Sequence, residues 1–292
     1  MIKSLSVLRL RDKISEIKLL LVPHVGNREA YWIARDVIED VLGYSEVDIL
    51  LKGDELLSDF VCSKIDKIVA RLVAGEPLQY VLGWARFAGN RYEVTRDTLI
   101  PRPETQELVD LICSQYAEQK DLKVIDIGTG SGCIAISLAR GLKFAQVDAI
   151  DISEGALDVA RRNSQQLKTK VNFVCRDALN MQVDTPEYYD IVVSNPPYIA
   201  DKERDEMEHR VLDYEPQSAL FVPDENPLMF YEAIAQWGSK ALKQGGRIFF
   251  EINPIYASSM KTMMMQLGYE DVAIIKDMQA KDRMLSACKR KI

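Results

Sequence analysis

From residue 123 to the end of the chain, short apolar runs alternate with longer amphipathic segments in a regular order. Parallel strands need a long crossover connection, usually a helix, so this alternation indicates strands that run parallel in one sheet. The sequence therefore predicts an α/β fold with a doubly wound, mostly parallel, seven-stranded sheet. We expect strands over 124–127, 145–150, 171–175, 189–194, 247–252 (after a turn at Gly245-Gly246), 272–275 and 284–288, and helices over 133–139, 156–167, 229–242 and 257–267.

The first 75 residues have a different pattern. One apolar helical stripe ends just before Gly43, and a second ends just before Gly75. Stripes of this kind bury one another in a small bundle, and glycine commonly ends a helix. We therefore expect a small N-terminal helical domain over residues 1–80 that serves for packing or for docking a protein, a β-hairpin-like connector over 81–100, and a main domain over 101–292.

The expected connector rests on two runs, 80–84 and 87–94, in which aromatic and β-branched residues are interrupted by Gly and Asn. That composition favours a hairpin over another helix. Next, Arg102 stands between two prolines, and Pro103 or Glu104 would open a helix that runs to about residue 119. Arg102 could face a ligand or could be a solvated turn residue, and the local sequence does not decide between these two interpretations.

Charge and composition narrow the class of protein. The formal net charge of −7 argues against broad contact with a nucleic-acid backbone, which depends on clustered Lys and Arg. No segment approaches the roughly 18 apolar residues of a membrane span. The five cysteines are odd in number and include no C-x-x-C, and only two histidines are present. We expect free thiols in a reducing compartment, no metal, and a cytoplasmic protein without membrane or direct nucleic-acid contact.

A glycine-rich segment, Asp126-Ile127-Gly128-Thr129-Gly130-Ser131-Gly132, lies between a predicted buried strand and a helix. Glycines let the backbone approach a ligand, and a helix N-terminus offers unpaired N–H donors. The spacing is G-x-G-x-G, with Cys133 where a dinucleotide fingerprint has its third glycine, which favours a ligand without a pyrophosphate. Cys133 could be a low-pKa thiol, but core packing is the favoured interpretation.

Carboxylates follow the next two predicted strands. Asp151 ends the second predicted strand. Its spacing along the sequence from the glycine segment is about that at which an acidic residue accepts two hydrogen bonds from ribose hydroxyls. Asp177, followed by Ala178, stands where a carboxylate could accept from an adenine amino group. Together with the glycine segment, these residues indicate a nucleoside site rather than incidental acidic ends of strands.

The predicted strand 189–194 ends in Asn195-Pro196-Pro197-Tyr198. The two prolines prevent the strand from continuing, so Asn195 stands at the carboxyl end of a strand, where open α/β sheets bind ligands. Its amide can donate to and accept from another planar amide or an amino-purine edge, and Tyr198 offers a flat ring. The motif indicates a site that presents a weakly nucleophilic sp2 nitrogen to an electrophile. The alternative is a strand followed by a Pro-Pro turn.

Two further features have plainer interpretations, which we favour. The charged run 201–206 is expected to be a solvated loop or helix face, with contact to a basic partner as the alternative. The methionines of 257–267 are expected to fill the core rather than to bind a cofactor.

Residues 126–132, Asp151 and Asp177 resemble the S-adenosylmethionine pocket of class I methyltransferases, and residues 195–198 resemble the motif of enzymes that methylate planar nitrogens. The segment 99–105 narrows the resemblance to the release-factor glutamine methyltransferases, the PrmC/HemK family. The resemblance covers most of the chain from about residue 75 onward, and the N-terminal domain matches in layout more than in residues. Further agreement comes from Glu76-Pro77-Leu78-Gln79-Tyr80, Tyr214-Glu215-Pro216, Lys276-Asp277 and Asp282-Arg283.

The resemblance implies a Rossmann-like fold and methyl transfer from S-adenosylmethionine to the side-chain nitrogen of the glutamine in the Gly-Gly-Gln tip of class 1 peptide chain release factors. It also implies residue roles. The cofactor would lie against Asp126, Gly128, Thr129, Gly130, Ser131, Gly132, Asp151, Asp177, Ala178 and Asn195. The catalytic residues would be Asn195, Pro196 and Tyr198, and the substrate would contact Asn195, Pro196, Pro197, Tyr198 and Arg102.

The chain departs from the family pattern at two places. The family usually has Pro-Glu-Thr-Glu where this chain has Gln106, and it usually has Glu-Ile-Gly, with a Gln soon after, where this chain has Glu251-Ile252-Asn253-Pro254. Two other functions stay open. An Asn-Pro-Pro-Tyr site also serves N6-adenine or N2-guanine methylation of DNA or RNA, against which the acidic balance and residues 100–105 stand. The second is a binding protein that keeps the cofactor fold but has lost turnover. The intact Asn195 motif argues against it.

Overall fold

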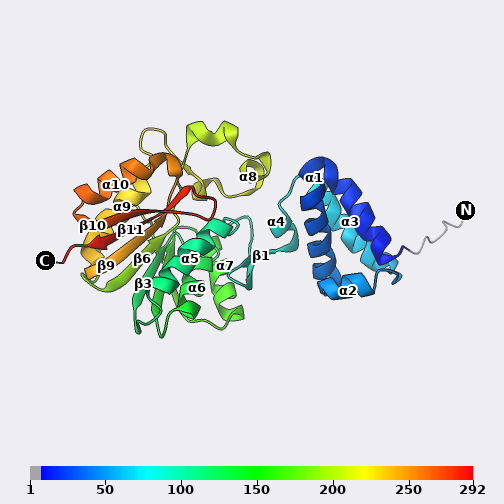
Figure 1. Ribbon diagram of the computed structural model, residues 1–292, viewed down its shortest axis with the longest axis horizontal. Helices are drawn as coiled ribbons and strands as arrows, with labels where there is room; N and C mark the ends of the chain where they lie inside the picture. Colours follow the sequence, from blue (N-terminus) through cyan, green and yellow to red (C-terminus); the bar gives the residue numbers. More distant parts are fainter. Residues whose placement is uncertain (1–7, 292) are drawn as a thin grey trace, which may run out of the picture. The chain divides into compact units, whose positions relative to one another are not determined.

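The computed structural model describes residues 8–291, which form two compact units (Figure 1). The first unit reaches to Gly83 and also includes α8 (His209–Tyr214). The second comprises Trp84–Glu208 and Glu215–Ile292. Within the described residues, no helix is both long and apolar enough to span a membrane.

The first unit is helical, as its apolar stripes predict. It contains α1 (Leu10–Leu42), α2 (Glu46–Leu51), α3 (Asp59–Val73) and α4 (Leu78–Leu82). Gly43 ends α1 in the left-handed conformation, with φ 69°, and its N–H donates to the carbonyl of Glu39. A core of aliphatic side chains from α1 and α3 holds the helices together.

The prediction of a hairpin over residues 80–94 is wrong in its first part, because residues 80–82 lie in α4. Pro77 precedes this helix with φ −56°, close to the helical value, and Gly83 ends it at φ 81° by donating to the carbonyl of Gln79. In this short segment, Pro77 before the helix and Gly83 after it favour a helix more strongly than the composition of residues 78–82 favours a strand. The hairpin itself is confirmed as β1 (Trp84–Phe87) paired antiparallel with β2 (Asn90–Glu93).

The second unit is built on a seven-stranded sheet of order β10-β11-β9-β6-β3-β4-β5, which confirms the predicted fold class. The five strands from β9 to β5 run parallel, and β11 and β10 extend the sheet in antiparallel fashion. The strands are β3 (Lys123–Ile127), β4 (Gln146–Asp151), β5 (Val171–Cys175), β6 (Tyr189–Ser194), β9 (Leu242–Glu251), β10 (Tyr269–Lys276) and β11 (Asp282–Lys289).

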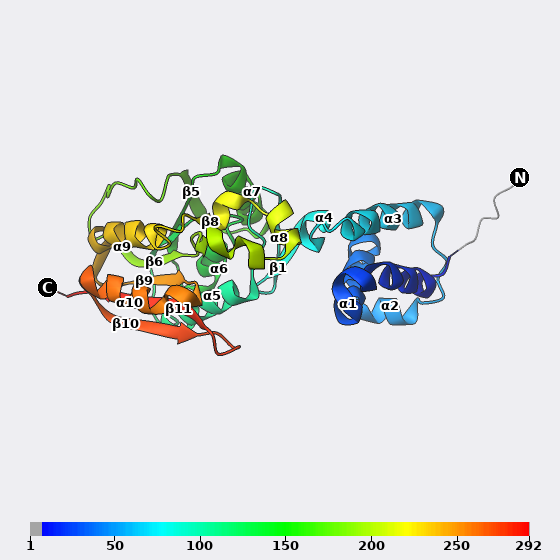
Figure 2. The ribbon, with the colours of Figure 1, turned by 90° about the horizontal axis from the view of Figure 1, so that it is seen from above.

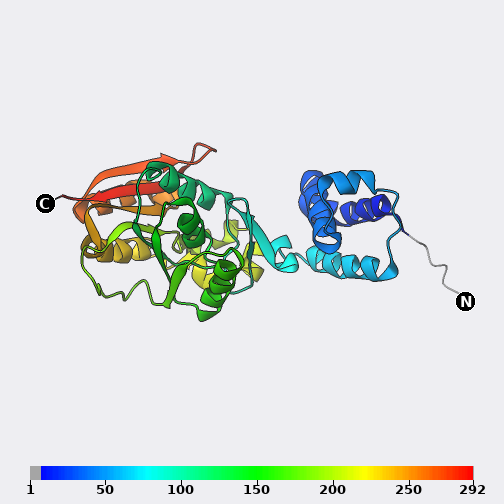
Figure 3. The ribbon, with the colours of Figure 1, turned by 90° about the horizontal axis from the view of Figure 1, so that it is seen from below.

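Helices cover both faces of this sheet (Figure 1). They are α5 (Pro103–Gln115), α6 (Cys133–Gly141), α7 (Glu154–Gln166), α9 (Met229–Ala241) and α10 (Ala257–Gln266). Because side chains alternate along a strand, Val124 and Val193 pack under α5 and α6, while Ile125 and Val192 pack under α9 and α10. Figure 2 shows α9 and α10 side by side. Figure 3 shows green helices, among them α6, which covers the opposite face of the sheet.

Most boundaries lie within three residues of the prediction, and two differ by more. Helix α5 ends at Gln115 rather than near residue 119. The turn expected at Gly245-Gly246 lies inside β9, where Gly245 has φ 78° and the register against β6 shifts. The glycines therefore make an irregularity within one long strand rather than a turn before it.

The plainer interpretations of two segments are confirmed. Residues 201–206 form a largely exposed 3-10 helix. Met260 and Met264 of α10 are fully buried in the core, while Met265 is exposed to solvent.

Candidate active site

A cavity of about 290 Å³ opens at the carboxyl ends of β3, β4, β5 and β6. Its wall comes from four strand ends and from residues 97–105, so segments far apart in sequence meet there. This is where an open parallel sheet binds its ligands. The cavity brings together most of the predicted site residues, namely Arg102, Gly128, Thr129, Gly130, Ser131, Asp151, Asp177, Ala178, Asn195, Pro196 and Pro197.

Three predicted site residues, Asp126, Gly132 and Tyr198, are not among the described residues that line the cavity. Asp126 lies fully buried beneath the glycine segment. Gly132 is the residue before α6. Tyr198 is half-buried and packs against the core shared with α9 and α10. All three lie next in sequence to residues that do line it, or in hydrogen-bond contact with them.

The glycine segment needs its glycines for backbone conformation. Gly128, Gly130 and Gly132 have φ of 76°, 54° and 80°, in the left-handed region that other residues adopt only with strain. A Cβ at Gly128 or Gly130 would meet no atom within 4 Å, so the backbone there stays open to the cavity. A Cβ at Gly132 would lie 3.0 Å from Ala160 Cβ, so close packing against α7 adds a second constraint.

Asp126 holds the shape of this segment from below. Its Oδ2 accepts from the Thr129 hydroxyl at 2.6 Å and from the backbone N–H of Ala135 at 3.2 Å. Its Oδ1 has no hydrogen-bond partner among the described residues. Complete burial raises the pKa of Asp126 to about 7.

Two more carboxylates stand at neighbouring strand ends. Asp151 accepts from the backbone N–H of Gly130 at 2.8 Å and of Ser153 at 2.9 Å, which ties β4 to the glycine segment. Burial raises the pKa of Asp151. Asp177 accepts from the backbone N–H of Leu179 at 2.9 Å. Its other oxygen accepts from Asn180 Nδ2 at 2.6 Å. Each carboxylate oxygen can accept a second hydrogen bond, and both residues line the cavity.

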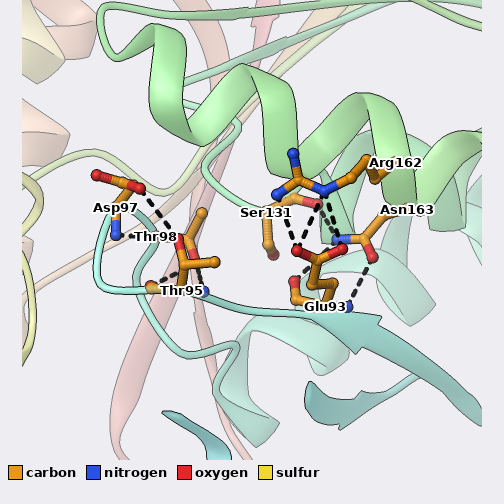
Figure 4. A network of polar contacts seen from close by, with 7 residues as sticks. All are labelled: Glu93, Thr95, Asp97, Thr98, Ser131, Arg162 and Asn163. Carbon is orange, nitrogen blue, oxygen red and sulfur yellow. Dashed lines mark hydrogen bonds and ion pairs between the residues drawn. The ribbon is translucent and has the colours of Figure 1, made fainter. Parts of the chain in front are cut away.

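Asn163 of α7 is a supporting residue that the sequence did not reveal (Figure 4). Its fully buried amide donates to the carbonyls of Glu93 and Ser131 at 3.0 and 2.9 Å, and accepts from the N–H of Glu93 at 2.6 Å. On the same helix, Arg162 pairs with the Glu93 carboxylate at 2.8 Å. Asn163 thereby joins the hairpin, α7 and the glycine segment.

Arg102 forms an ion pair with Glu215. Its Nη2 lies 2.5 Å from Oε1 of Glu215, whose Oε2 accepts from the backbone N–H of Ile100 at 3.1 Å. Glu215 is almost fully buried, while one third of the Arg102 side chain is exposed. The guanidinium therefore fastens residues 100–102 to the segment after α8, and it lines the cavity from that fixed position.

Asn195 belongs to a chain of hydrogen bonds that runs from the cavity wall, which Thr105 also lines, to the buried Glu251. Its Nδ2 donates to Thr105 Oγ1 at 3.2 Å, and Thr105 Oγ1 donates to Glu251 Oε2 at 2.6 Å. The Tyr198 hydroxyl donates to Glu251 Oε1 at 3.1 Å. Both ends of the Asn195–Tyr198 motif are therefore tied to one buried carboxylate.

The sequence gives only indirect signals for these hydrogen bonds. Thr105 lies in a segment that carries the family resemblance, and Glu251 lies in one that departs from it, but the sequence does not assign a role to either residue. Arg283, also in such a segment, pairs with Asp277 at 3.3 Å and places positive charge near Glu251. Burial raises the pKa of Glu251, and the charge of Arg283 opposes that shift.

The departures from the family pattern have structural partners. Gln106 Oε1 accepts from the backbone N–H of Ala88 at 3.1 Å, in the turn of the β1–β2 hairpin. Asn253 Nδ2 donates to the Tyr198 carbonyl at 3.3 Å and to Glu203 Oε2 at 3.0 Å. Asn253 thus holds the chain just after the Asn195 motif.

The alternative of a reactive thiol at Cys133 is wrong. Its side chain packs in the core beneath α6, and burial raises the pKa of the thiol to about 12. A thiol with that pKa stays protonated near neutral pH, so it is a packing residue.

The cavity fits S-adenosylmethionine, the cofactor that the resemblance implies. Glycine backbone without side chains forms part of the wall, and the carboxylates of Asp151 and Asp177, which can accept from hydroxyl and amino groups, line the same cavity. The unpartnered Oδ1 of Asp126 leaves a buried polar atom without a protein partner under the glycine segment. The site therefore suits a nucleoside.

Comparisons with known proteins agree with this geometry. A family profile described as "Methyltransferase small domain" matches residues 105–218, and one described as "PrmC N-terminal domain" matches residues 24–83. The chain is 47% identical over 248 residues to a release factor glutamine methyltransferase of Bacteroides thetaiotaomicron, with 85% of this chain and 88% of that protein covered. It is 37% identical over 252 residues to the protein of the same name from Flavobacterium psychrophilum, with 85% and 88% covered.

Among solved structures, a 16S rRNA N2 methyltransferase of T. thermophilus in complex with AdoMet and guanosine resembles this chain in fold. The TM-score is 0.51 at 19% identity, and the match covers 71% of this chain and 50% of that one.

Proposed function

The chain belongs to the release factor glutamine methyltransferase family, and we propose that it methylates the side-chain amide nitrogen of the glutamine in the Gly-Gly-Gln tip of class 1 peptide chain release factors. The methyl donor is S-adenosylmethionine, and the modification supports translation termination. The observation that carries the proposal is that Asn195 lines the same cavity as the glycine segment and Asp151. An amide acceptor site and a nucleoside site thus share one cavity.

For the cofactor, we assign backbone contacts to residues 128–131 and ribose contacts to Asp151. Asp177, with Ala178, would meet the adenine. Asp126 and Gly132 would act indirectly, because they shape the glycine segment from behind. S-adenosylmethionine, when bound, supplies a methyl group on a positively charged sulfur that a nucleophile can attack in line.

For the substrate, Asn195 Oδ1 and the Pro196 backbone carbonyl would accept the two amide N–H groups of glutamine. An amide nitrogen is a weak nucleophile because its lone pair is delocalised, so these bonds aim it and favour the positive charge that develops on it. No dedicated base is required, since the proton can leave after transfer. Stacking of Tyr198 on the amide plane stays a prediction, and so does direct contact with Arg102.

The partner is a protein, and we propose that the reaction takes place in the cytoplasm, where release factors act. The family membership and the five free cysteines support this location. Neither a metal nor direct nucleic-acid binding is part of the proposal. The formal net charge of −7 is consistent with a protein substrate.

The test supplies tritiated S-adenosylmethionine to the full-length protein with a purified release factor. A release factor with Gly-Gly-Ala in place of Gly-Gly-Gln is the matched control, and DNA and ribosomal RNA are tested in parallel. Label in the wild-type release factor alone is expected. Label in nucleic acid would replace the proposal with N6-adenine or N2-guanine methylation, and measurable cofactor binding without any label would favour a binding protein.

A further inference from the structure

The Asn195 side chain has two chemically different ends, and only one orientation serves the proposed reaction. Its Oδ1 can accept a hydrogen bond from a substrate N–H, whereas Nδ2 can only donate. The end that faces the substrate is decided by the contact that the other end makes. Nδ2 lies 3.2 Å from Thr105 Oγ1.

The direction of the neighbouring hydrogen bonds imposes this orientation. The Thr105 hydroxyl donates to Glu251 Oε2 at 2.6 Å and the Tyr198 hydroxyl donates to Oε1 at 3.1 Å. Both must donate when the carboxylate is ionised, the form that Arg283 favours, because an ionised carboxylate only accepts. Thr105 has then used its single proton and can only accept from Asn195. The amide must therefore turn Nδ2 toward Thr105, which leaves Oδ1 for the cavity that Asn195 lines.

The surroundings of Glu251 include charges of both signs. Burial and the nearby Glu104 disfavour the ionised carboxylate, while Arg283 and the two hydroxyl donors favour it. Thr105 and Glu251 are themselves nearly fully buried, so water competes little for the bond between them. The hydrogen-bond chain is thus a built feature of the protein interior.

We propose that Glu251, acting through Thr105, is a positioning residue that fixes the orientation of the Asn195 amide and thereby makes the site select a glutamine amide over a glutamate carboxylate. This inference rests on the proposed function. A glutamine tip brings two N–H donors to Asn195 Oδ1 and the Pro196 carbonyl. A glutamate tip brings only acceptors, which would face acceptors and be rejected.

The test measures how tightly two release factors bind to the full-length protein loaded with S-adenosylhomocysteine. One has the natural Gly-Gly-Gln tip, and the other has Gly-Gly-Glu. The variants are Thr105→Val, which keeps the shape and removes the hydroxyl, and Thr105→Ser, which restores it. Tyr269→Phe is the control, because it removes another buried hydroxyl, one that donates to the Ala235 carbonyl at 2.8 Å and lies outside the cavity lining.

Wild type, Thr105→Ser and Tyr269→Phe are expected to prefer the glutamine tip by about tenfold or more. In Thr105→Val the amide can reverse, so the preference should fall toward one. The same variant should lose about 10- to 100-fold in kcat, with unchanged affinity for S-adenosylmethionine. Glu251→Gln, which has the same shape but can also donate, should lose part of the preference.

A Thr105→Val or Glu251→Gln protein that binds the cofactor and keeps the wild-type preference overturns the inference. Loss of cofactor binding in both variants also overturns it, because their role would then be structural. If wild type neither binds nor methylates the natural release factor, the proposed function fails instead, and this outcome is read directly from the wild-type measurement.

Discussion

Arg102 and Glu215 lie 113 residues apart in the chain and form an ion pair of 2.5 Å in which the carboxylate is buried. The pair connects the segment before α5 to the segment after α8. Both segments contribute to the cavity wall, through Pro101 on one side and Pro216 on the other. The shape of this part of the cavity wall therefore depends on long-range contacts of Glu215, with Arg102 and with the backbone N–H of Ile100.

Arg102→Ala should destabilise the second unit by about 1–3 kcal/mol, because it leaves the Glu215 carboxylate buried with one backbone donor. This figure is below that of a fully buried pair, since a third of the Arg102 side chain is exposed. Urea denaturation of the full-length protein measures the change. Arg161→Ala, which breaks the exposed pair with Asp158, is the control and should cost less than about 1 kcal/mol. Equal losses in the two variants would contradict the structural role given to Arg102.

Gly132→Ala should lower the affinity for S-adenosylmethionine. The substitution brings about 1–2 kcal/mol of left-handed strain and a contact of 3.0 Å with α7, and the glycine segment must shift to relieve both. Calorimetric titration measures the affinity. Gly89→Ala, at φ 72° with no neighbouring atom within 4 Å, carries the same strain in the hairpin turn and should leave the affinity unchanged. Unchanged affinity in Gly132→Ala would refute the requirement for its positive φ.

Asn163→Ala should cost about 2–4 kcal/mol of stability, because it removes at once the partners of three backbone groups, one buried and two part-buried. It should also weaken cofactor binding, since one of these groups is the Ser131 carbonyl of the glycine segment. The neighbouring Arg162→Ala tests the exposed half of the same contact and should cost less than about 1 kcal/mol. Denaturation and cofactor titration of both variants measure how much the Asn163 amide and the exposed Arg162 ion pair each contribute. If Arg162→Ala were the more damaging, the buried amide would not be what holds the segment.

Asp126 should give the ligand-free protein a characteristic pH dependence. Its pKa rises from the ordinary 3.8 to about 7 on folding, so between these values the folded state binds a proton that the unfolded chain does not. Stability conferred by this group therefore falls as pH rises through that window and levels off above it, by up to about 1.4 kcal/mol per pH unit. The groups that face the carboxyl are the Thr129 hydroxyl, the Ala135 N–H and Asp151.

Asp126→Asn keeps the shape and removes the titration, so its stability relative to wild type should rise as the pH increases from about 4 to 7. Urea denaturation at several pH values measures this difference. Asp158→Asn, on the exposed surface of α7, should show no such trend. A wild-type curve parallel to that of Asp126→Asn would contradict the raised pKa.

Much of the fold could be predicted from the sequence, and most of the predicted site residues line the cavity, because their signals are local. The β-branched run before Asn195 and the two prolines after it define the end of β6 without reference to the rest of the chain. The glycine segment is equally local. The short helix α4 was missed because two capping residues outweigh the aromatic composition between them.

The supporting contacts could not be predicted, because they depend on which strands become neighbours. Thr105 and Glu251 are 146 residues apart, and they meet only because residues before β3 fold over the end of β9. Asn163 and Glu93 are 70 residues apart and meet through the packing of the hairpin on α7. A motif search finds the residues that face a ligand, whereas those that hold them in place appear only in the folded protein.

The measurement that tests the central claim most directly is mass spectrometry of the release-factor tip peptide after reaction with S-adenosylmethionine. With wild-type protein, fragmentation should place one added methyl group on the glutamine side chain of Gly-Gly-Gln. With Asn195→Ala, the peptide should stay almost unmodified while cofactor affinity is largely retained. A methyl group on any other residue, or undiminished methylation by Asn195→Ala, would contradict the account.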